Sequence, residues 1–152
     1  MTVERQLRQA GVADIERLMQ LDEVCFDDPW SQRLWLSMLE KPGRYLAWVV
    51  ESQGEVIAFI LFSRILDEAE LLRIGTRPDF QGQGVARTML LHAQELLAQR
   101  GVGSFHLEVR ESNHVARQLY KGAGWSRCGR RKNYYADEEG SEDALLFSLL
   151  LG

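Results

Sequence analysis

The chain contains few cysteines and prolines and no long hydrophobic run. Its 152 residues include two cysteines, Cys25 and Cys128, and three prolines. Two cysteines without metal-ligand spacing exclude a disulfide framework and a zinc-type site, so we expect reduced thiols and no bound metal. No apolar stretch approaches the roughly 20 residues that cross a bilayer, and the first residues form no secretory hydrophobic segment. These absences predict a cytoplasmic protein with no membrane partner.

The residues that are present are typical of a globular protein. Hydrophobic residues make up 45% of the sequence and charged residues 26%, and the length suits a single core. We therefore expect one domain over residues 1–152. The formal net charge of −4 argues against nonspecific attraction to nucleic acid, so we expect no stable nucleic-acid complex. Composition leaves the oligomeric state open.

Helix-like and strand-like hydrophobic periods alternate along the chain without a linker or repeat. Ser31 is placed to cap a helix, and Trp30 and Trp35 are spaced as a hydrophobic staple around its start. The predicted elements are a strand over 2–8, a helix over 13–24, a helix from 31 to about 41, strands over 45–51, 56–65 and 69–76, a helix over 87–100, a strand around 105–109, a short helix over 113–121, and strands over 125–135 and 144–150. The predicted fold class is α/β with a mixed sheet.

The most informative segment is a glycine-rich turn, Gln81–Arg87, between a predicted strand and a predicted helix. Gly82 and Gly84 allow consecutive N–H groups to face one concavity, and the helix adds its own unpaired N–H groups and dipole. Two close glycines more often serve only a turn. The third glycine of a dinucleotide motif and the Lys-Ser/Thr pair of a nucleotide-triphosphate loop are both missing. The turn therefore favours a diphosphate-bearing cofactor held by backbone, with Arg87 and Gln81 as side-chain helpers.

The residues after the turn predict a crossover connection. Phe105, Leu107 and Val109 alternate with polar residues, so a strand with one apolar and one polar face follows the helix. A strand, a helix and a second strand in succession place the two strands parallel to each other. The three strands before the turn are expected to be antiparallel neighbours.

Four segments, in the right order, resemble the GCN5-related N-acetyltransferases (GNAT). They are Asp67–Leu71, Gln81–Ala86, Leu107–Arg110, and Asn113–Trp125 with Ala116, Leu119, Tyr120 and Gly124 at the family's spacing. Three flanking segments are similar to the bacterial ribosomal-protein alanine N-acetyltransferases: Phe26–Ser31, Arg131–Tyr135 and Glu142–Ala144. The resemblance implies a single-domain GNAT fold, with a mixed, mostly antiparallel central sheet of six to seven strands flanked by about four helices.

The same resemblance implies a donor and an acceptor. The donor would be acetyl-CoA, and the partner would be the N-terminal segment of a ribosomal protein, namely the terminal alanine of small-subunit ribosomal protein eighteen. In this family the glycine turn holds the CoA pyrophosphate and the preceding strand lies along pantetheine. The matching cofactor-binding residues are Ile74, Gly75, Thr76, Gln81, Gly82, Gln83, Gly84, Val85, Ala86, Arg87 and Asn113. This chain departs from the subfamily at Gly75-Thr76-Arg77, where a small, an apolar and an acidic residue are usual.

The resemblance also implies Glu108 as general base and Tyr120 as general acid. An α-amine, with a pKa of about 7.7–8.0, needs only a weak base, and Glu108 is on the polar face of its strand. The ordinary alternatives are an exposed, ion-paired glutamate and a core tyrosine, and His106 is a rival base on the same face. Because a phenol is a poor proton donor to a thiolate, we expect Tyr120 to orient the sulfur as much as to protonate it.

Trp30, Tyr134 and Tyr135 are expected to form walls around the acceptor alanine. Five acidic residues gather between the last two strands, either as a solvated loop or as an attractor for a basic peptide: Asp137, Glu138, Glu139, Glu142 and Asp143. Two other functions stay open, namely a related enzyme that acetylates a small amine or lysine, and an acyl-CoA-binding module without turnover.

Overall fold

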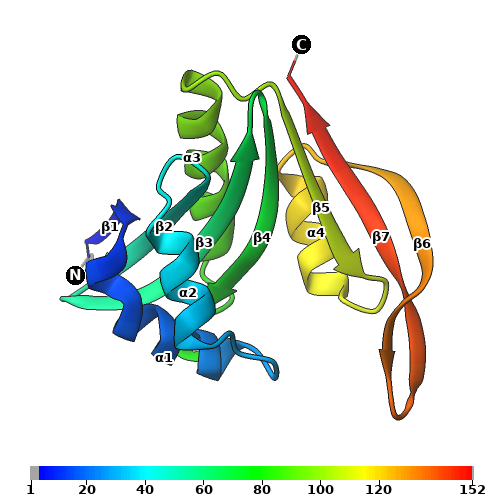
Figure 1. Ribbon diagram of the computed structural model, residues 1–152, viewed down its shortest axis with the longest axis horizontal. Helices are drawn as coiled ribbons and strands as arrows, with labels where there is room; N and C mark the ends of the chain where they lie inside the picture. The colour runs from blue at the N-terminus through cyan, green and yellow to red at the C-terminus, as the bar shows by residue number, and fades with distance from the viewer. Residues whose placement is uncertain (1–3, 152) are drawn as a thin grey trace.

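The computed structural model describes residues 4–151, which fold into one seven-stranded sheet and four α-helices (Figure 1). The elements are β1 (Arg5–Ala10), α1 (Ile15–Cys25), α2 (Gln32–Leu39), β2 (Tyr45–Ser52), β3 (Glu55–Ile65), β4 (Glu68–Thr76), α3 (Val85–Gln99), β5 (Ser104–Arg110), α4 (His114–Gly122), β6 (Ser126–Asp137) and β7 (Gly140–Leu150), with short 3-10 turns at Val12–Asp14 and Pro78–Phe80. The α/β class and the predicted strand and helix numbers are confirmed.

The sheet is mixed and mostly antiparallel, in the order β1-β2-β3-β4-β5-β7-β6. Strands β2, β3 and β4 form the expected antiparallel meander, and β4 and β5 form the expected parallel pair across the α3 crossover. That parallel pairing is short. It begins at Glu68↔Ser104 and ends at Glu70↔His106, after which the two strands diverge (Figure 1). The remaining parts of β4 and β5 therefore border an opening in the sheet.

The helices cover the two faces of the sheet separately. On one face, α3 and α4 pack on a core that includes Trp48, Phe62 and Phe105. On the other face, α1 and α2 pack on a core that includes Trp35 and Phe59. Figure 1 shows α1 and α2 over the β2–β4 half only, so this face of β5, β7 and β6 has no helix over it.

A β-bulge interrupts β4 where it parts from β5. The register with β3 shifts so that Leu61 pairs with Arg73 while Phe62 pairs with Leu71, which leaves Leu72 as the extra residue. Leu71 faces the α3 core, whereas Arg73 contacts groups of α1 and its following loop. The bulge thus changes which residues of β4 face each layer.

Several local signals in the sequence are confirmed. Ser31 Oγ accepts a hydrogen bond from Leu34 N at 3.2 Å, and the Trp30 and Trp35 rings are 5.0 Å apart at the start of α2. Gln53 and Gly54 both have positive φ in the β2–β3 turn. Boundaries differ most at the last strand, which begins at residue 140 rather than 144. The two predicted strands do form a hairpin, but β6 continues to Asp137 and β7 begins at Gly140, so the loop is shorter than predicted, because the charged residues there hide the strand period.

Other boundaries differ by smaller amounts. The first strand spans Arg5–Ala10 rather than 2–8, and residues 2 and 3 of that prediction lie outside the described residues. Helix α3 begins at Val85, directly after the glycine turn, rather than at residue 87. Within residues 4–151, no helix is both long and apolar enough to cross a membrane.

Candidate active site

The glycine-rich turn has the backbone conformation that an anion site requires. Gly82 and Gly84 have φ of 77° and 79°, and a Cβ atom at either position would meet no atom within 4 Å. Gly84 is the N-cap of α3 and provides no side chain to cap the helix. The first N–H groups of α3 therefore face open space beside the turn.

The polar side chains of the turn have different partners. Gln81 Nε2 donates to the Thr76 carbonyl at 3.1 Å, and Gln83 Oε1 accepts a hydrogen bond from Arg5. The two glutamines thus hydrogen-bond the turn to β4 and to β1. Arg87 forms no ion pair with any carboxylate in residues 4–151, which leaves its guanidinium available as the cation of the turn.

A cavity of about 450 Å³ extends from the glycine turn along the end of β4 to the start of α4. All the predicted cofactor residues except Gln83 line it. Sequence reasoning missed six other lining residues: Cys25, Phe26, Phe80, Val115, Ala116 and Leu119. Ala116 and Leu119 belong to the family motif noted in the sequence, and the apolar spacing of Val115, Ala116 and Leu119 on α4 is a second signal that could have indicated them.

Thr76 provides a direct test of whether this cavity fits acetyl-CoA. Its side-chain oxygen is buried without a hydrogen-bond partner, although the residue lines the cavity. Its carbonyl already accepts from Cys25 Sγ at 3.3 Å and from Gln81 Nε2. An unpaired buried hydroxyl is costly unless a ligand pairs with it. Amide-bearing pantetheine suits this hydroxyl, and the open glycine turn suits a diphosphate.

Asn113 and Cys25 are cavity residues with structural roles. Asn113 Oδ1 accepts from Ala116 N at 3.1 Å, so the predicted cap of α4 is confirmed. Burial raises the pKa of the Cys25 thiol to about 11, with a smaller contribution from the charge of Asp22. Cys25 is therefore a neutral thiol at physiological pH, which makes it a poor nucleophile.

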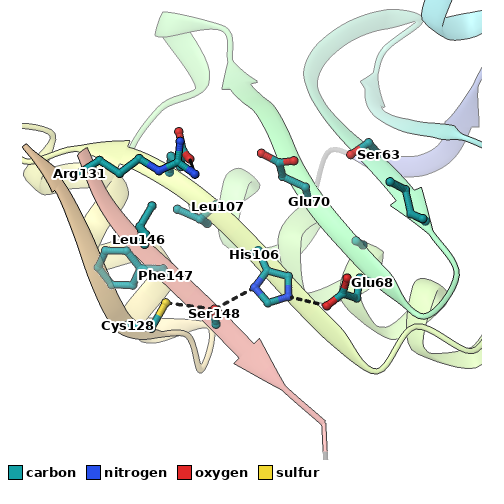
Figure 2. Close-up of a pocket in the computed structure, with 13 residues that line it drawn as sticks. Ser63, Glu68, Glu70, His106, Leu107, Cys128, Arg131, Leu146, Phe147 and Ser148 are labelled. Atoms are coloured by element: carbon teal, nitrogen blue, oxygen red, sulfur yellow. Dashed lines mark hydrogen bonds and ion pairs between the residues drawn. The ribbon is translucent and has the colours of Figure 1, made fainter. Parts of the chain in front are cut away.

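Glu108 lies on β5 beyond the last residue paired with β4, on the sheet face that has no helix over it. Its Oε1 is 3.3 Å from Arg131 Nη2, and its side chain is 22% exposed. It lines a second cavity of about 340 Å³ between β4, β5 and the β6–β7 hairpin (Figure 2). His106, the rival base, lines the same cavity, but its ring nitrogens contact Ser148 Oγ at 3.0 Å and Ser104 Oγ at 3.3 Å.

Tyr120 is a core residue as well as a candidate acid. It is 6% exposed, and its ring packs against Trp125 and Phe147 with centroids 5.9 and 6.2 Å away. It lines neither the cofactor cavity nor the Glu108 cavity. Burial raises the pKa of its phenol well above the ordinary value. The hydroxyl therefore stays protonated at physiological pH and is suited to donating a hydrogen bond.

The three predicted acceptor residues lie on two different elements. Trp30 is in the loop before α2, where its ring stacks on the Arg73 guanidinium at 4.3 Å. Tyr134 and Tyr135 are on β6, with their rings 5.1 Å apart and perpendicular. Arg110 lies over Tyr135 at 4.2 Å. The two tyrosines thus lie near the C-terminal end of β5, where Arg110 is. Trp30 belongs to the loop that packs on β4.

Three of the five acidic residues in the β6–β7 hairpin accept internal hydrogen bonds. Asp137 Oδ1 accepts one, from Glu139 N at 2.9 Å, and the other two accept more. Glu142 accepts from Ser112 N at 2.9 Å and from Arg110 at 3.1 Å, and Asp143 accepts from Arg130 at 2.7 Å and from Asn133 N at 2.9 Å. These bonds hold the pKa of both carboxyls below their ordinary values. Glu142 and Asp143 therefore mainly stabilise the hairpin, and Asp137 bonds within its turn, so any attraction of a basic peptide would fall chiefly to Glu138 and Glu139.

A buried ion pair that sequence reasoning missed joins α1 to β4. Arg73 Nη1 donates to Asp22 Oδ1 at 2.6 Å, and Asp22 Oδ2 accepts from Trp30 N and Trp35 Nε1. Asp22 is fully buried, and the Arg73 guanidinium is also stacked on Phe26 at 4.2 Å. This cluster fixes the loop before α2 onto the strand that borders the cofactor cavity.

Comparison with known proteins agrees with this geometry. Residues 15–125 match the acetyltransferase (GNAT) family. The chain is 35% identical over 136 residues to the [ribosomal protein bS18]-alanine N-acetyltransferase of Escherichia coli K12, covering 90% of each chain. It is 32% identical over 148 residues to a putative enzyme of the same name from Bacillus subtilis, covering 96% of this chain and 95% of that one.

Solved structures give the same result. The crystal structure of the ribosomal-protein-S18-alanine N-acetyltransferase from Escherichia coli superposes with a TM-score of 0.90 at 32% identity, covering 98% of this chain and 95% of that one. Arabidopsis thaliana NAA60 in complex with acetyl-CoA shares the fold, with a TM-score of 0.84 at 18% identity over 97% of this chain and 98% of that one. The chain therefore belongs to the acetyltransferase (GNAT) family and is an N-acetyltransferase.

Proposed function

We propose that this enzyme transfers the acetyl group of acetyl-CoA to the N-terminal alanine of ribosomal protein S18 in the cytoplasm. The observation that carries the proposal is the divergence of β4 and β5 after Glu70 and His106. A cavity with an anion-binding turn at one end lies along the diverging part of β4, and the Glu108 carboxylate projects from the diverging part of β5. The relatives that span nearly the whole chain are named for this acceptor.

The proposed reaction begins with removal of a proton from the acceptor α-ammonium. Its pKa of about 7.7–8.0 means that a substantial fraction is charged at neutral pH, and only the neutral amine is a nucleophile. Glu108 accepts that proton directly or through a water molecule. Its ion pair with Arg131 holds the carboxylate in the opening, and the partly exposed side chain leaves an oxygen accessible to the amine.

The cofactor residues act by holding and orienting. When bound, acetyl-CoA supplies the activated acetyl thioester. The N–H groups at the start of α3 and the Arg87 guanidinium bind its diphosphate, and the Thr76 hydroxyl pairs with a polar group of pantetheine. Tyr120 lines neither cavity itself, but it belongs to α4, whose Ala116 and Leu119 line the cofactor cavity. From there its protonated hydroxyl would donate a hydrogen bond toward the departing sulfur. The side chains of three aromatic residues form the walls of the acceptor-alanine site: Trp30, Tyr134 and Tyr135.

A peptide assay tests this function. Purified enzyme is incubated with acetyl-CoA and peptides that begin with Ala, Ser or Met, or that have a blocked terminus and an internal lysine. The acetyl group is then located by mass spectrometry. We expect α-amine acetylation of the alanine peptide. Acetylation confined to the lysine or to polyamines would replace the proposal with a different acceptor class. Binding of acetyl-CoA without release of free CoA in the presence of any amine would indicate a module without turnover.

A further inference from the structure

The cavity that contains Glu108 continues away from it across the sheet, along a row of polar residues. Register partners define the row: Ser63 on β3 pairs with Glu70 on β4, Glu70 pairs with His106 on β5, and His106 pairs with Ser148 on β7. All four line the same cavity of about 340 Å³. Figure 2 shows their side chains on one face of the sheet. We call this part of the cavity the polar groove.

The charges of the polar groove are predominantly negative. Glu68, Glu70 and Glu108 line the cavity, and Arg131 is the one arginine or lysine among its lining residues. Arg131 is paired with Glu108, and Glu68 lies 3.7 Å from His106 Nε2. Glu70 forms no ion pair or side-chain hydrogen bond within residues 4–151. The groove therefore has a carboxylate that is free to receive a cation.

A second feature of the groove indicates that a polar ligand enters it. Ser63 is only 9% exposed, and its hydroxyl makes no side-chain hydrogen bond with another residue of the described chain. The hydroxyl lines the cavity beside Glu70, its register partner. The hydroxyl oxygen is itself accessible from the cavity, so it is free to pair with a hydrogen-bonding guest. The aliphatic side chains of Ile65 and Leu146 also line the cavity and can pack against an alkyl stem.

Strand geometry sets the reach from Glu108 to Glu70. Glu70 lies opposite His106, which is two residues from Glu108 on the same face. A rise of about 3.3 Å per residue and a strand separation of about 4.8 Å put the two glutamates roughly 8 Å apart at the backbone. An extended peptide with its α-amine at Glu108 would bring its second or third residue to that distance. An arginine or lysine stem at either position is long enough to reach Glu70.

From these observations we propose that the polar groove binds a basic side chain at the second or third residue of the acceptor peptide, with Glu70 and Glu68 as its charge partners. This inference rests on the proposed function, because it takes the α-amine to be at Glu108. It makes the groove a specificity-determining site that selects acceptors by a charge close to the acetylated terminus.

The test uses peptides that begin with Ala and carry either arginine or its uncharged analogue citrulline at residue 2, 3 or 4. At low salt we expect arginine at residue 2 or 3 to raise kcat/KM about threefold to tenfold over citrulline, mainly through KM. The double variant Glu68→Gln/Glu70→Gln should lose this preference while keeping its kcat for citrulline peptides. Added salt should weaken the preference in the parent.

Glu95→Gln is the matched control. Glu95 is exposed on α3, on the opposite face of the sheet, and its substitution removes one negative charge of the same kind as each of the two removed in the double variant. This variant should keep the arginine preference. Equal kcat/KM for arginine and citrulline peptides in the parent would overturn the groove assignment while leaving the proposed function intact. So would a preference that persists in the double variant. Failure to acetylate the α-amine of every peptide would overturn the proposed function and the groove assignment together.

Discussion

At the residue scale, Gly75 is required by its contacts rather than by an unusual backbone conformation. A Cβ atom there would lie 3.0 Å from Phe59 Cε1, 3.1 Å from Phe26 Cε2 and 3.2 Å from Cys25 Sγ. Gly75→Ala should therefore lower the free energy of unfolding by about 1–3 kcal/mol, as measured by urea denaturation. Gly122→Ala on α4 is the control, because its Cβ would meet nothing within 4 Å. Equal stability of Gly75→Ala and the parent would contradict the packing argument.

Glu108 and His106 are rival candidates for the general base, and substitution of each predicts a different effect on kcat. Glu108→Gln should lower kcat by about 10²–10⁴-fold and leave acetyl-CoA affinity nearly unchanged. Activity should recover toward alkaline pH, where the α-amine loses its proton without help. His106→Gln should have a much smaller effect, since its ring nitrogens contact Ser148 and Ser104. Kinetics of both variants from pH 6 to 10 decide between the bases, and the reverse order of effects would transfer the role to His106.

The sequence predicts the conformation of individual residues well only where a motif or a conformational requirement marks them. Gly82 and Gly84 are marked by the turn, and the structure gives both the positive φ that glycine favours. Thr76 has no such mark, because the burial of its unpaired hydroxyl and the bonds from Cys25 and Gln81 to its carbonyl arise only in the folded chain. The contacts of Cys25, far away in the sequence, could not be read from its neighbours.

At the element scale, the proposed anion site at the start of α3 can be tested by comparing Gly84 with Gly54, a second glycine that has the same backbone conformation. Gly84 and Gly54 both have φ of 79° and space for a side chain. Gly84→Val and Gly54→Val should each cost about 1–3 kcal/mol of stability, since a valine in this region is strained. Only Gly84→Val should also weaken acetyl-CoA binding, by roughly tenfold or more, because its side chain would occupy the anion site. Titration calorimetry measures this difference, and equal affinities in the two variants would remove the anion site from the glycine turn.

Two carboxylates, those of Asp22 and Asp28, pair with Arg73, and we expect the contact between α1 and β4 to depend on Asp22. Asp22 is fully buried at 2.6 Å from the guanidinium, whereas Asp28 is 82% exposed at 3.2 Å. Asp22→Ala should destabilise the fold by about 3–5 kcal/mol, because it removes the buried partner of Arg73 and leaves Trp30 N and Trp35 Nε1 without an acceptor. Asp28→Ala should cost no more than about 1 kcal/mol. Thermal or urea unfolding compares the two, and similar losses would show that the buried pair has no special weight.

The start of α2 and the β2–β3 turn were predictable at this scale, whereas features that need a distant partner were not. The Ser31 cap, the Trp30–Trp35 staple and the Gln53–Gly54 turn are local, and all three are confirmed. The β4 bulge is a mismatch of register with β3, so the sequence of β4 alone does not reveal it. From the local sequence, Asp22 is expected to be an exposed acid on a helix, because its partner Arg73 is 51 residues away.

At the scale of the whole molecule, the parallel crossover was predictable, but the separation of the two cavities was not. A strand, glycine turn, helix and strand dictate a parallel β4–β5 pair. The Glu108 cavity also needs residues of β6 and β7, because Cys128, Arg131 and Leu146 line it. Their position follows from the strand order β5-β7-β6, which depends on long-range pairing. The sequence motifs therefore indicate the donor site more directly than the acceptor side.

The stability of the whole molecule should fall steeply in acid, because paired carboxylates join separate parts of the fold. Hydrogen bonds from Arg8 hold the pKa of Asp14 below its ordinary value of 3.8 where β1 meets the turn before α1. The pKa of Glu142 is lowered by hydrogen bonds from Ser112 and Arg110, where the β6–β7 hairpin meets the end of β5. The pKa of Asp143 is lowered by Arg130 and Asn133 within the hairpin. A lowered folded-state pKa stabilises the fold above the unfolded-state pKa, and this stabilisation is lost as pH falls through the folded-state value.

The loss should therefore begin near pH 5 and continue below pH 3.8, as the unfolded chain takes up protons that the folded chain resists. Urea unfolding at pH 7, 5, 4 and 3 measures it. Asp14→Asn should be less stable than the parent at pH 7 and should lose less stability on acidification, because one of the coupled carboxylates is gone. Glu95→Gln, at an exposed position that forms no ion pair within residues 4–151, should keep the acid slope of the parent. An Asp14→Asn variant with the parent's slope would show that the Arg8 contact does not couple folding to pH.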